Sequence, residues 1–476
     1  MRLNKEQYAA ARHTDGPMLV LAGPGSGKTH LLVERIRMMI EDSGIPPENI
    51  LVITFSKKAA RQMQARFIRS NPKHSYPVTF GTFHAVFYHI LLDHDPDTGT
   101  LITEEQQMMF VRDAIKKLSY YPIGISADML TETMTGLISV YKNIGDEIYT
   151  RSEYAKLLDA SERCGFADLV EEYNRLCHKE GLIDFDDMIL LCGKLLYEHE
   201  YVLRKWQRKY KYILIDEFQD INETQYNVLR LLAGDTQNVF AVGDDDQSIY
   251  AFRGSRPELM KKFLKQYHGC KKITLTLNYR CCKNVIGASD TLIRHNIERL
   301  SRPMQRHLPS RPDGEILVVN AQNTLVQAAF VCDMIEDMIT KSGYDLCDFA
   351  VLYRSDFCAK QLVKEAQLRG LLPKNNTTTH KDSINVMTAH ASKGLEFRVV
   401  FIIGLQEGLF PHYKSMSDEL IEEERRLMYV AMTRAIERLY LCSLSVDHGK
   451  RESRFVDEAT KKAQYIKDVL RLIRCG

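Results

Sequence analysis

The glycine-rich stretch at residues 22–29 reads Ala22-Gly23-Pro24-Gly25-Ser26-Gly27-Lys28-Thr29. An apolar run at 18–21 precedes it, and a helical pattern at 31–36 follows it. A strand, a glycine-rich loop and a helix in this order bind phosphate, because backbone N–H groups and the helix N-terminus face the anion. Lys28 is predicted to reach the β- and γ-phosphates, and Thr29 to bind Mg²⁺. Ala22 replaces the glycine of the strict pattern, and either residue fits a tight turn.

A second apolar run, at 212–215, ends in the two carboxylates Asp216 and Glu217. Such a run suits a strand buried on both faces of a sheet. Carboxylates at its end are costly unless a cation or hydrogen bonds satisfy them. Mg²⁺ on Asp216, with a water activated by Glu217 as general base, would do so. The alternative is an acidic helix cap after a core strand. Beside the phosphate loop, the pattern favours an enzyme that hydrolyses a nucleoside triphosphate.

Bulk composition narrows the class of protein. The 476 residues allow about three domains. A net charge of +2 gives no overall polyanion signal, so any nucleic-acid surface must be local. The eleven cysteines show no CxxC spacing, which indicates reduced thiols rather than a disulfide framework or metal site. No secretory segment and no membrane-spanning run is visible, so we expect a cytoplasmic protein without a membrane partner.

The first part of the chain alternates between strand and helix patterns. Helices are expected at 57–70 and 222–233, and strands at 17–22, 49–55, 78–82, 211–216 and 238–243. This alternation predicts a parallel sheet covered by helices. Between about 91 and 185 strand signals vanish, and 104–118 and 152–164 look helical. We interpret this part as a helical insertion.

A second alternation starts near Ile273. Its expected helices are 324–338 and 420–435, and its expected strands are 273–277, 315–319, 348–353, 384–388, 398–404 and 438–443. The predicted fold class is therefore α/β, with two parallel-sheet domains and a helical insertion in the first. The predicted boundaries are 1–90 with 186–275 for the first domain, 91–185 for the insertion and 276–476 for the second domain. The polar stretch 374–382 reads as a loop.

Seven further motifs follow one another along nearly the whole chain. They lie at 3–7, 53–60, 81–84, 242–254, 277–280, 388–397 and 429–435, and include Leu277-Asn278-Tyr279-Arg280 and Tyr429-Val430-Ala431-Met432-Thr433-Arg434-Ala435. In this order they resemble the UvrD/PcrA/Rep family of superfamily one DNA helicases. The resemblance implies two RecA-like P-loop domains, ATP with Mg²⁺ as cofactors, and DNA as the partner.

The resemblance also implies roles around ATP. Gln7 would bond adenine, Tyr279 would stack on it and Glu396 would hold the ribose. The implied ATP-binding residues are Gln7, Ala22, Gly23, Pro24, Gly25, Ser26, Gly27, Lys28, Thr29, His30, Tyr279, Arg280, Glu396 and Arg434; the catalytic residues are Lys28, Glu217, Gln247, Arg280 and Arg434; the Mg²⁺ ligands are Thr29 and Asp216. An arginine on the transferring phosphoryl group is worth about 10³–10⁵ in rate. Because both arginines lie in the second predicted domain, domain closure would depend on ATP.

Each role has a structural alternative. The two arginines could form surface ion pairs, worth about 0–1 kcal/mol. Tyr279 could be a core residue, Glu396 a helix cap and Gln247 a plain turn amide that does not sense the γ-phosphate.

For DNA, the family pattern places aromatic side chains between bases, which is worth about 1–3 kcal/mol per base. The implied DNA-binding residues are Phe55, Lys57, Thr82, His84, Tyr250, Phe252, Arg253, Arg354, His390 and His412. An aromatic residue at a strand end is otherwise more often part of the core.

The chain departs from the family pattern in four places. Phe252 replaces the usual Trp, which keeps stacking with less area. His30 replaces an Arg that packs on the base, which makes that contact pH-sensitive. Asp356 replaces an Asn that contacts DNA in relatives. This contact is not carried over, because a carboxylate would lie close to a polyanion. The stretch 374–382 stands where relatives insert a helical subdomain, and it is too short to be a domain. The resemblance implies that the missing part contacts duplex DNA and restrains unwinding by single molecules.

The sequence thus predicts an ATP-dependent helicase that moves 3′→5′ on single-stranded DNA and unwinds duplexes at single/double-strand junctions. One alternative is a translocase that strips proteins and unwinds weakly. Another is a nucleotide-gated DNA clamp that binds without stepping. A P-loop kinase is disfavoured, because nothing resembles a site for an acceptor substrate. Protein partners stay open.

Overall fold

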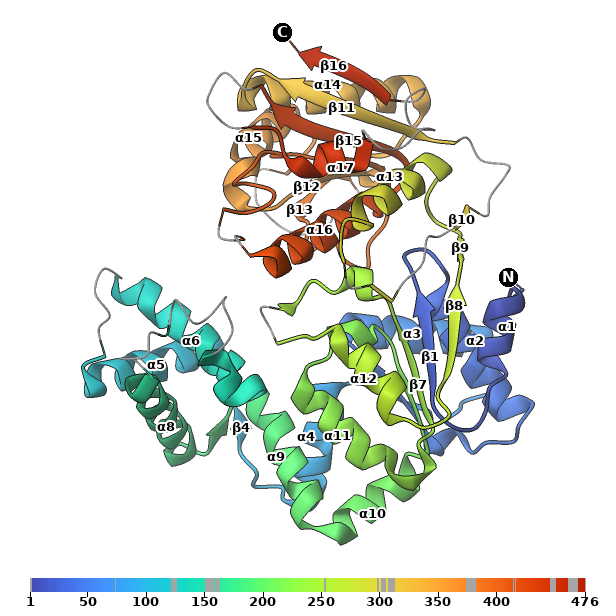
Figure 1. Cartoon of the computed structure of the whole chain (residues 1–476), viewed down its shortest axis with the longest axis vertical. Helices are drawn as coiled ribbons and strands as arrows, with labels where there is room; N and C mark the ends of the chain where they lie inside the picture. The colour runs from blue at the N-terminus through green and yellow to red at the C-terminus, as the bar shows by residue number, and fades with distance from the viewer. Residues whose placement is uncertain are drawn as a thin grey trace. The chain divides into compact units, whose positions relative to one another are not determined.

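The chain forms two compact units in the computed structural model (Figure 1). The described residues are 2–72, 74–120, 126–149, 158, 163–251, 254–297, 299–300, 305–306, 313–373, 382–413, 415, 417–445, 451–460 and 470–475. The first unit comprises Met1–Val20, Thr29–Gly243 and Tyr250–Ile273, and the second comprises Leu21–Lys28, Asp244–Ile249 and Thr274–Gly476. The phosphate loop therefore groups with the second unit.

The first sheet has six strands in the order β3-β2-β6-β7-β1-β8. They are β1 (Met18–Ala22), β2 (Ile50–Thr54), β3 (Thr79–Thr82), β6 (Tyr212–Ile215), β7 (Val239–Gly243) and β8 (Lys271–Leu275). β2 pairs in parallel with β3 and β6, and β6 pairs in parallel with β7. Strands β1, β2 and β7 are buried along their whole length, because helices cover both faces. Parallel strands end at one edge, which brings together the segments that follow them.

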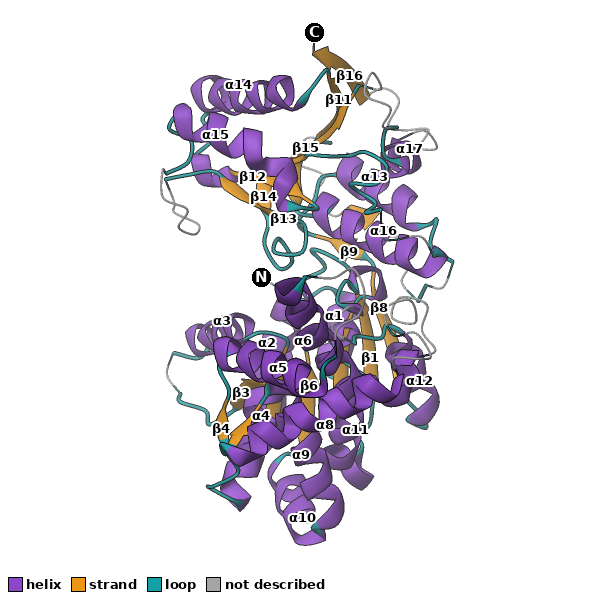
Figure 2. Ribbon diagram, turned by 90° about the vertical axis from the view of Figure 1, so that its left-hand side faces the viewer, coloured by secondary structure: helices purple, strands orange, loops and turns teal. Residues whose placement is uncertain are grey.

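Helices flank this sheet on both sides (Figures 1 and 2). They are α1 (Lys5–Ala11), α2 (Lys28–Glu41), α3 (Lys57–Ser70), α4 (Phe83–His94), α9 (Phe185–Glu198), α10 (Glu200–Lys209), α11 (Glu223–Ala233) and α12 (Glu258–Gln266). Ser56 caps α3 by accepting from the Ala59 N–H at 3.1 Å, and Thr82 caps α4. Short hydroxyl residues thus turn the chain from strand to helix directly at the strand ends. The predicted helices at 57–70 and 222–233 are confirmed.

A set of helices between β3 and β6 has a hydrophobic core of its own. It contains α5 (Glu104–Leu118), α6 (Ala127–Ile144) and α8 (Arg163–Lys179), which bury Val111, Leu137 and Leu169 among other residues. The expectation of no strands here is wrong, because β4 (Thr100–Leu101) pairs in parallel with β5 (Leu182–Ile183). Two-residue strands are too short to show a periodic pattern. The helix predicted at 104–118 is confirmed, whereas 150–157 and 159–162 lie outside the described residues.

A buried ionic cluster joins α6 to the start of α9. Lys142 Nζ lies 2.7 Å from Asp184 Oδ2 and 2.8 Å from Asp187 Oδ1, and the Lys142 side chain is 4% exposed. The Tyr173 hydroxyl also donates to Asp184 at 3.0 Å. Burial opposes the charge on Lys142, but the two carboxylates outweigh it and raise its pKa. The cluster is stable because every charge in it has a partner.

A Lys142→Met variant should therefore unfold more easily. It leaves Asp184 and Asp187 buried without their cation, and removing one partner of a buried pair costs about 3–5 kcal/mol. Urea unfolding monitored by circular dichroism measures the change. Arg112→Met is the control, because the Arg112–Asp128 pair is exposed and such pairs contribute about 0–1 kcal/mol. Equal losses in the two variants would contradict the importance of the buried cluster.

The second sheet has the order β13-β12-β14-β15-β11-β16, and all its pairings are parallel. Its strands are β11 (Glu315–Ala321), β12 (Phe349–Tyr353), β13 (Asn385–Thr388), β14 (Phe397–Ile402), β15 (Ala435–Leu444) and β16 (Leu470–Cys475). Its helices are α13 (Lys283–Ile293), α14 (Thr324–Ser342), α15 (Lys360–Leu368), α16 (Asp418–Met432) and α17 (Arg454–Thr460). In Figure 2, α14 and α15 lie on one face, and α13, α16 and α17 on the other. A short parallel pair joins β9 (Leu277–Asn278) to β10 (Gln305–Arg306).

The predicted α/β class with two parallel sheets is confirmed, with one strand misplaced. The run predicted at 273–277 was assigned to the second alternation, but β8 (Lys271–Leu275) is an edge strand of the first sheet, next to β1. A local pattern predicts that a strand forms but not which sheet it joins. Strand β16 was not predicted. No helix of the described part is long and apolar enough to cross a membrane.

Candidate active site

The phosphate loop approaches the segment after β9 very closely. A Cβ on Gly25, whose φ is +67°, would lie 2.6 Å from both Arg280 Cβ and Asn278 Oδ1. The Tyr279 N–H donates to the Gly25 carbonyl at 2.8 Å. Within the loop, Ser26 Oγ donates to the Gly23 carbonyl at 2.8 Å. Only glycine fits at position 25, both for its backbone conformation and for this contact.

Arg280 is held by a turn and by an ion pair. Asn278 Oδ1 accepts from the Arg280 N–H at 2.8 Å, and Arg280 Nε lies 2.6 Å from Glu396 Oε2. In this structure Arg280 therefore forms an ion pair, as the structural alternative proposed. Its partner, Glu396, is the residue predicted to bind the ribose. Glu396 directly precedes β14, so the helix-cap alternative is wrong. Tyr279 is partly exposed, so it is not a core residue.

Arg434 lies between α16 and β15 and is only 1% exposed. Its Nε donates to the Val430 carbonyl at 2.9 Å, and its Nη1 donates to the Leu395 carbonyl at 3.1 Å. Its Nη2 donates to Gln247 Oε1 at 3.5 Å. A buried guanidinium is stable only when acceptors satisfy it. The surface ion-pair alternative is therefore wrong for Arg434.

Gln247 is anchored on three sides within the second unit. Its Nε2 donates to Asp244 Oδ2 at 2.6 Å, and its carbonyl accepts from Lys393 Nζ at 2.7 Å. The neighbouring Asp246 accepts two hydrogen bonds from Arg299, at 2.8 and 2.6 Å. Burial raises the pKa of Asp246 to about 7, and Arg299 opposes this shift. Gln247 also ends a short 3₁₀ helix (Asp245–Gln247), so the turn-amide alternative stays open.

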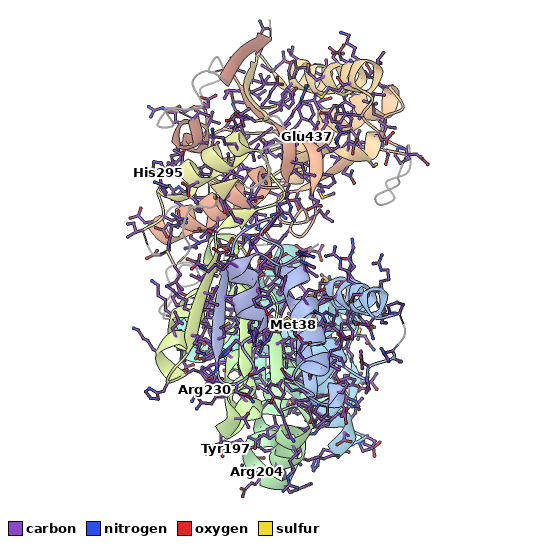
Figure 3. The ribbon with its side chains drawn as sticks, turned by 90° about the vertical axis from the view of Figure 1, so that its right-hand side faces the viewer. Met38, Tyr197, Arg204, Arg230, His295 and Glu437 are labelled. Carbon is purple, nitrogen blue, oxygen red and sulfur yellow. The ribbon has the colours of Figure 1, made fainter. Side chains whose placement is uncertain are left out.

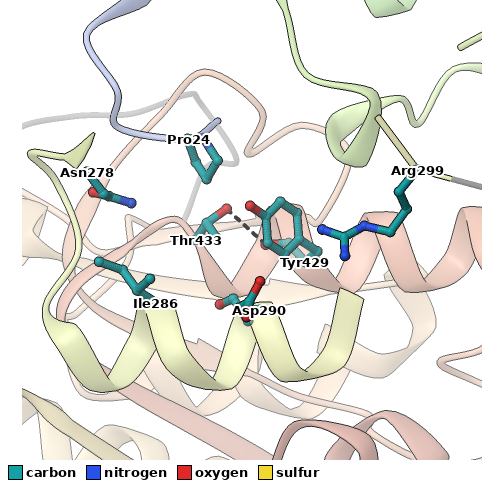
Figure 4. Close-up of a pocket in the computed structure, with 8 residues that line it drawn as sticks. Pro24, Asn278, Ile286, Asp290, Arg299, Tyr429 and Thr433 are labelled. Atoms are coloured by element: carbon teal, nitrogen blue, oxygen red, sulfur yellow. Dashed lines mark hydrogen bonds between the residues drawn. The ribbon is translucent and has the colours of Figure 1, made fainter. Parts of the chain in front are cut away.

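A pocket of the second unit opens beside the phosphate loop (Figure 4). Thr433 Oγ1 donates to the Tyr429 carbonyl at 2.9 Å on one wall. The lining residues are Pro24, Asn278, Ile286, Ser289, Asp290, Arg299, Tyr429 and Thr433. The pocket brings the loop together with α13 and α16, so segments distant in sequence surround one cavity with polar and apolar walls.

The end of β6 carries the paired carboxylates. Asp216 is 8% exposed, and its Oδ1 accepts from the Glu217 N–H at 3.1 Å. Gln219 Nε2 donates to Glu217 Oε2 at 2.6 Å. Glu217 precedes the 3₁₀ helix Phe218–Asp220 but makes no side-chain capping bond, so the helix-cap alternative is wrong. Its φ of +54° is costly for a residue with a side chain, and such strain occurs at functional sites.

The donor set suits Mg²⁺ by its chemistry. The Asp216 carboxylate ends β6, and the Thr29 hydroxyl lies in the first turn of α2. Both are hard oxygen donors, which Mg²⁺ prefers over nitrogen or sulfur.

Gln7, which is predicted to bind adenine, takes part in the cap of helix α1. Gln7 N–H donates to Asn4 Oδ1 at 2.8 Å, and Gln7 Oε1 accepts from the Asn4 N–H at 3.0 Å. At the other end of α1, Arg35 of α2 donates to the Ala11 carbonyl at 3.3 Å while 2% exposed. Burial lowers the pKa of Arg35 to about 9. Arg35 thus joins α1 to the helix that follows the phosphate loop. His30 lies partly exposed in the first turn of that helix.

Several predicted DNA residues gather at the strand ends of the first unit. The rings of Phe55 and Tyr250 stack with centroids 4.8 Å apart and an interplanar angle of 18°. Phe55 is 37% exposed, so it is not a core residue. Burial and the charge of Lys57 lower the pKa of His84. Thr82 is buried as the cap of α4. Phe252 and Arg253 lie outside the described residues.

Other predicted DNA residues lie in the second unit. Arg354 Nε lies 2.9 Å from Glu424 Oε1, and the His412 N–H donates to Glu424 Oε2 at 3.1 Å. A single buried carboxylate therefore positions both residues. His390 is partly exposed in the segment that follows β13.

Sequence reasoning missed three residues that hold this site together. Asn278 and Lys393 lie inside recognised motifs, and their polar side chains next to Arg280 and Gly394 were the available signal. Arg299 lies outside every motif, and only its contact with Asp246 identifies it.

Comparisons with known proteins identify the family. The family described as UvrD/REP helicase N-terminal domain matches residues 3–268, more than half of the chain. This chain belongs to the UvrD/REP helicase family. The family described as UvrD-like helicase C-terminal domain matches residues 358–445. The two RecA-like domains implied by the resemblance are thus confirmed as the fold class.

Three similar proteins extend the match along the chain. The putative ATP-dependent DNA helicase YjcD of Bacillus subtilis (strain 168) is 29% identical over 97% of this chain and 82% of its own length. The ATP-dependent DNA helicase PcrA of Staphylococcus epidermidis (strain ATCC 12228 / FDA PCI 1200) is 25% identical over 92% and 83%. The ATP-dependent DNA helicase Rep of Buchnera aphidicola is 25% identical over 94% and 96%. The YjcD alignment spans 631 residues, more than the 476 of this chain, so the relative carries segments that this chain lacks.

Proposed function

We propose that this ATP-dependent DNA helicase moves 3′→5′ along single-stranded DNA and separates strands at single/double-strand junctions. One observation carries the proposal. One compact unit contains the phosphate loop, Gln247, Arg280 and Arg434, although these residues are spread along the chain from position 21 to position 434. Coupling a phosphate loop to arginines from a distant part of the chain is how nucleotide binding becomes movement.

In the proposed reaction, Lys28 binds the β- and γ-phosphates and Glu217 takes a proton from the attacking water. Arg280 and Arg434 stabilise the charge that develops on the transferring phosphoryl group. Gln247, which contacts Arg434, senses whether the γ-phosphate is present. Bound Mg²⁺, held by Thr29 and Asp216, would supply further charge neutralisation. The structural support is the burial of Arg434 and the strained backbone of Glu217.

In the proposed DNA site, Phe55 and Tyr250 stack on bases, together with Phe252. The stacking of the exposed Phe55 ring on the partly exposed Tyr250 ring supports this role, because aromatic platforms bind any base sequence. The other proposed DNA residues contribute phosphate or base contacts: Lys57, Thr82, His84, Arg253, Arg354, His390 and His412. Gln7 and Tyr279 are proposed to bind adenine, and Glu396 is proposed to bind the ribose. His30 takes the place of the arginine that packs on the base in relatives.

We propose the domain division expected from the sequence. Residues 1–90 and 186–275 form the first RecA-like domain, 91–185 the helical insertion and 276–476 the second RecA-like domain. The separate hydrophobic core of α5, α6 and α8 supports the insertion. The stretch 374–382, of which 374–381 lie outside the described residues, would replace the second helical subdomain. The long alignment to YjcD supports a deletion in this chain. Cytoplasmic location stays a prediction.

Unwinding of tailed duplexes tests the polarity. Duplexes with a 3′ tail should be unwound much faster than duplexes with a 5′ tail, at matched rates of ATP hydrolysis. A preference for 5′ tails would overturn the 3′→5′ assignment.

A protein-stripping translocase with weak unwinding is a second candidate, favoured by the shortness of 374–382. Strand displacement and translocation measured on the same preparation separate the two functions, because a stripping motor moves without displacing strands. A DNA clamp would instead show little stimulation of ATP hydrolysis by DNA.

A further inference from the structure

Helix α3 (Lys57–Ser70) has an unusual charge distribution. It carries cationic side chains at five positions and no carboxylate: Lys57, Lys58, Arg61, Arg66 and Arg69. All five side chains are exposed. The chain as a whole is nearly balanced, with 64 basic and 62 acidic residues, so a helix with five cations and no carboxylate departs from the average of the chain.

Two other helices pair cations with carboxylates. On α14, Lys341 pairs with Asp337, and on α2, Arg37 pairs with Glu34 and Glu41. No ion pair within the described part of the chain involves any of the five cations of α3. Solvated protein surfaces normally mix both signs of charge. An exposed helix with one sign only is therefore suited to an anionic ligand rather than to solvation.

The helical repeat places the five cations together. Ala60, Met63 and Phe67 are buried and define the side of α3 that packs on the sheet. At 100° per residue, Lys58, Arg61 and Arg69 lie opposite this buried side, and Lys57 and Arg66 lie at its two margins. From Lys57 to Arg69 they follow the helix axis for ~18 Å, at 1.5 Å per residue. The result is a basic surface on the exposed side of the helix, which we call the α3 track.

The α3 track begins at the proposed DNA site. Thr54 of β2 and Thr82 of β3 are register partners, so both strands end at the same edge of the sheet. Phe55, which stacks on Tyr250, lies between the end of β2 and the start of α3. From this edge α3 runs along the outside of the first unit, over β2 and the edge strand β3 (Figure 2).

We propose that the α3 track binds the phosphate backbone of single-stranded DNA that continues beyond Phe55 and Tyr250. The inference rests on the proposed function of the strand-end residues and extends their site by the cations Arg61, Arg66 and Arg69. Single-stranded DNA is the ligand that the position favours, because the track continues from an aromatic platform that binds unpaired bases. The track binds through charge alone, so it does not select a base sequence.

A triple variant with Arg61→Gln, Arg66→Gln and Arg69→Gln tests the proposal. Glutamine keeps helix propensity and the exposed position, and none of the three residues belongs to the catalytic site. The measurement is binding of oligothymidylates of increasing length, over a range of salt concentrations, by fluorescence anisotropy. The matched control removes three exposed cations elsewhere, with Arg204→Gln, Arg208→Gln and Lys211→Gln. Figure 3 shows Arg204 at the α10 end of the first unit.

Wild type should gain affinity as the oligonucleotide grows past the strand-end contacts, and the triple variant should lose this gain. Each phosphate contact on a single strand contributes about 0.7 to the slope of log K against log salt. Losing three contacts reduces the slope by about 2. The ratio of wild-type to variant affinity for long oligonucleotides should therefore fall about 20-fold between 50 and 200 mM salt. Basal ATP hydrolysis and the affinity for the shortest oligonucleotide should be unchanged.

Three outcomes would overturn the proposal. The first is a triple variant with the wild-type length dependence and salt slope. The second is an equal loss in the α10 control, which would indicate a general effect of net charge. The third is a loss confined to blunt duplex DNA. If wild type does not bind even long oligonucleotides, the proposed function itself fails. If wild type binds short ones but gains nothing with length, only the α3 track fails.

Discussion

An Arg434→Gln variant is expected to hydrolyse ATP about 10³–10⁵-fold more slowly than wild type at saturating DNA. The substitution removes the positive charge proposed to stabilise the transferring phosphoryl group. Glutamine places its amide nitrogen where Arg434 has Nε, so it can keep the hydrogen bond to the Val430 carbonyl. The loss should therefore appear in kcat, with a smaller change in ATP binding, because the interaction strengthens in the transition state.

The control for this variant lies on α16, the helix that precedes Arg434. Arg426 pairs with Glu422 at 3.4 Å and has no proposed role at ATP, so Arg426→Gln should keep kcat within about twofold. Thermal unfolding of both variants separates a catalytic loss from misfolding. If Arg434→Gln folds like wild type and hydrolyses ATP at a similar rate, Arg434 has no catalytic role.

A Glu217→Gln variant should bind ATP and DNA normally but turn ATP over about 10²–10⁴-fold more slowly, the usual contribution of a general base. The amide has the shape of the carboxylate but cannot accept a proton from water. It can still accept the hydrogen bond from Gln219, so the strained turn after β6 should persist. DNA-stimulated phosphate release measures turnover, and a fluorescent nucleotide measures binding.

Glu223→Gln is the control for this second variant. Glu223 starts α11 and is close to Lys262, with no proposed contact to nucleotide, so turnover should stay near the wild-type rate. If the Glu217→Gln enzyme retains full turnover, another residue must be the general base. Loss of ATP binding together with turnover would instead show that Glu217 supports the site structurally.

Much of the site follows from local sequence. The phosphate loop could be predicted because glycine, lysine and threonine at fixed spacing between a strand and a helix have few other uses. The functional role of the carboxylates after β6 could be predicted because a charge at the end of a buried strand is costly unless a cation or a hydrogen bond stabilises it. The strand-end aromatic Phe55 needed the family pattern, since an isolated aromatic residue is more often part of a core.

Other features depend on contacts between segments far apart in the chain. In the sequence, Arg434 looks like one more charge of the helix expected at 420–435. In the structure it follows α16 and is buried against carbonyl groups and Gln247. Arg299 belongs to no motif, and its pairing with Asp246 is visible only after folding. Strand β8 was assigned to the wrong alternation because strand propensity carries no information about the neighbouring strand.

The amino-acid order alone therefore established two nucleotide motifs, the α/β class and the helical character of α3, because short-range spacing and periodicity encode them. Folding alone established that α3 leaves five cations exposed, with no carboxylate partner among the described residues, that Arg434 is buried, and that Arg280 pairs with Glu396. Burial and ion pairing depend on which segments meet in space, and the spacing of residues along one segment cannot specify that.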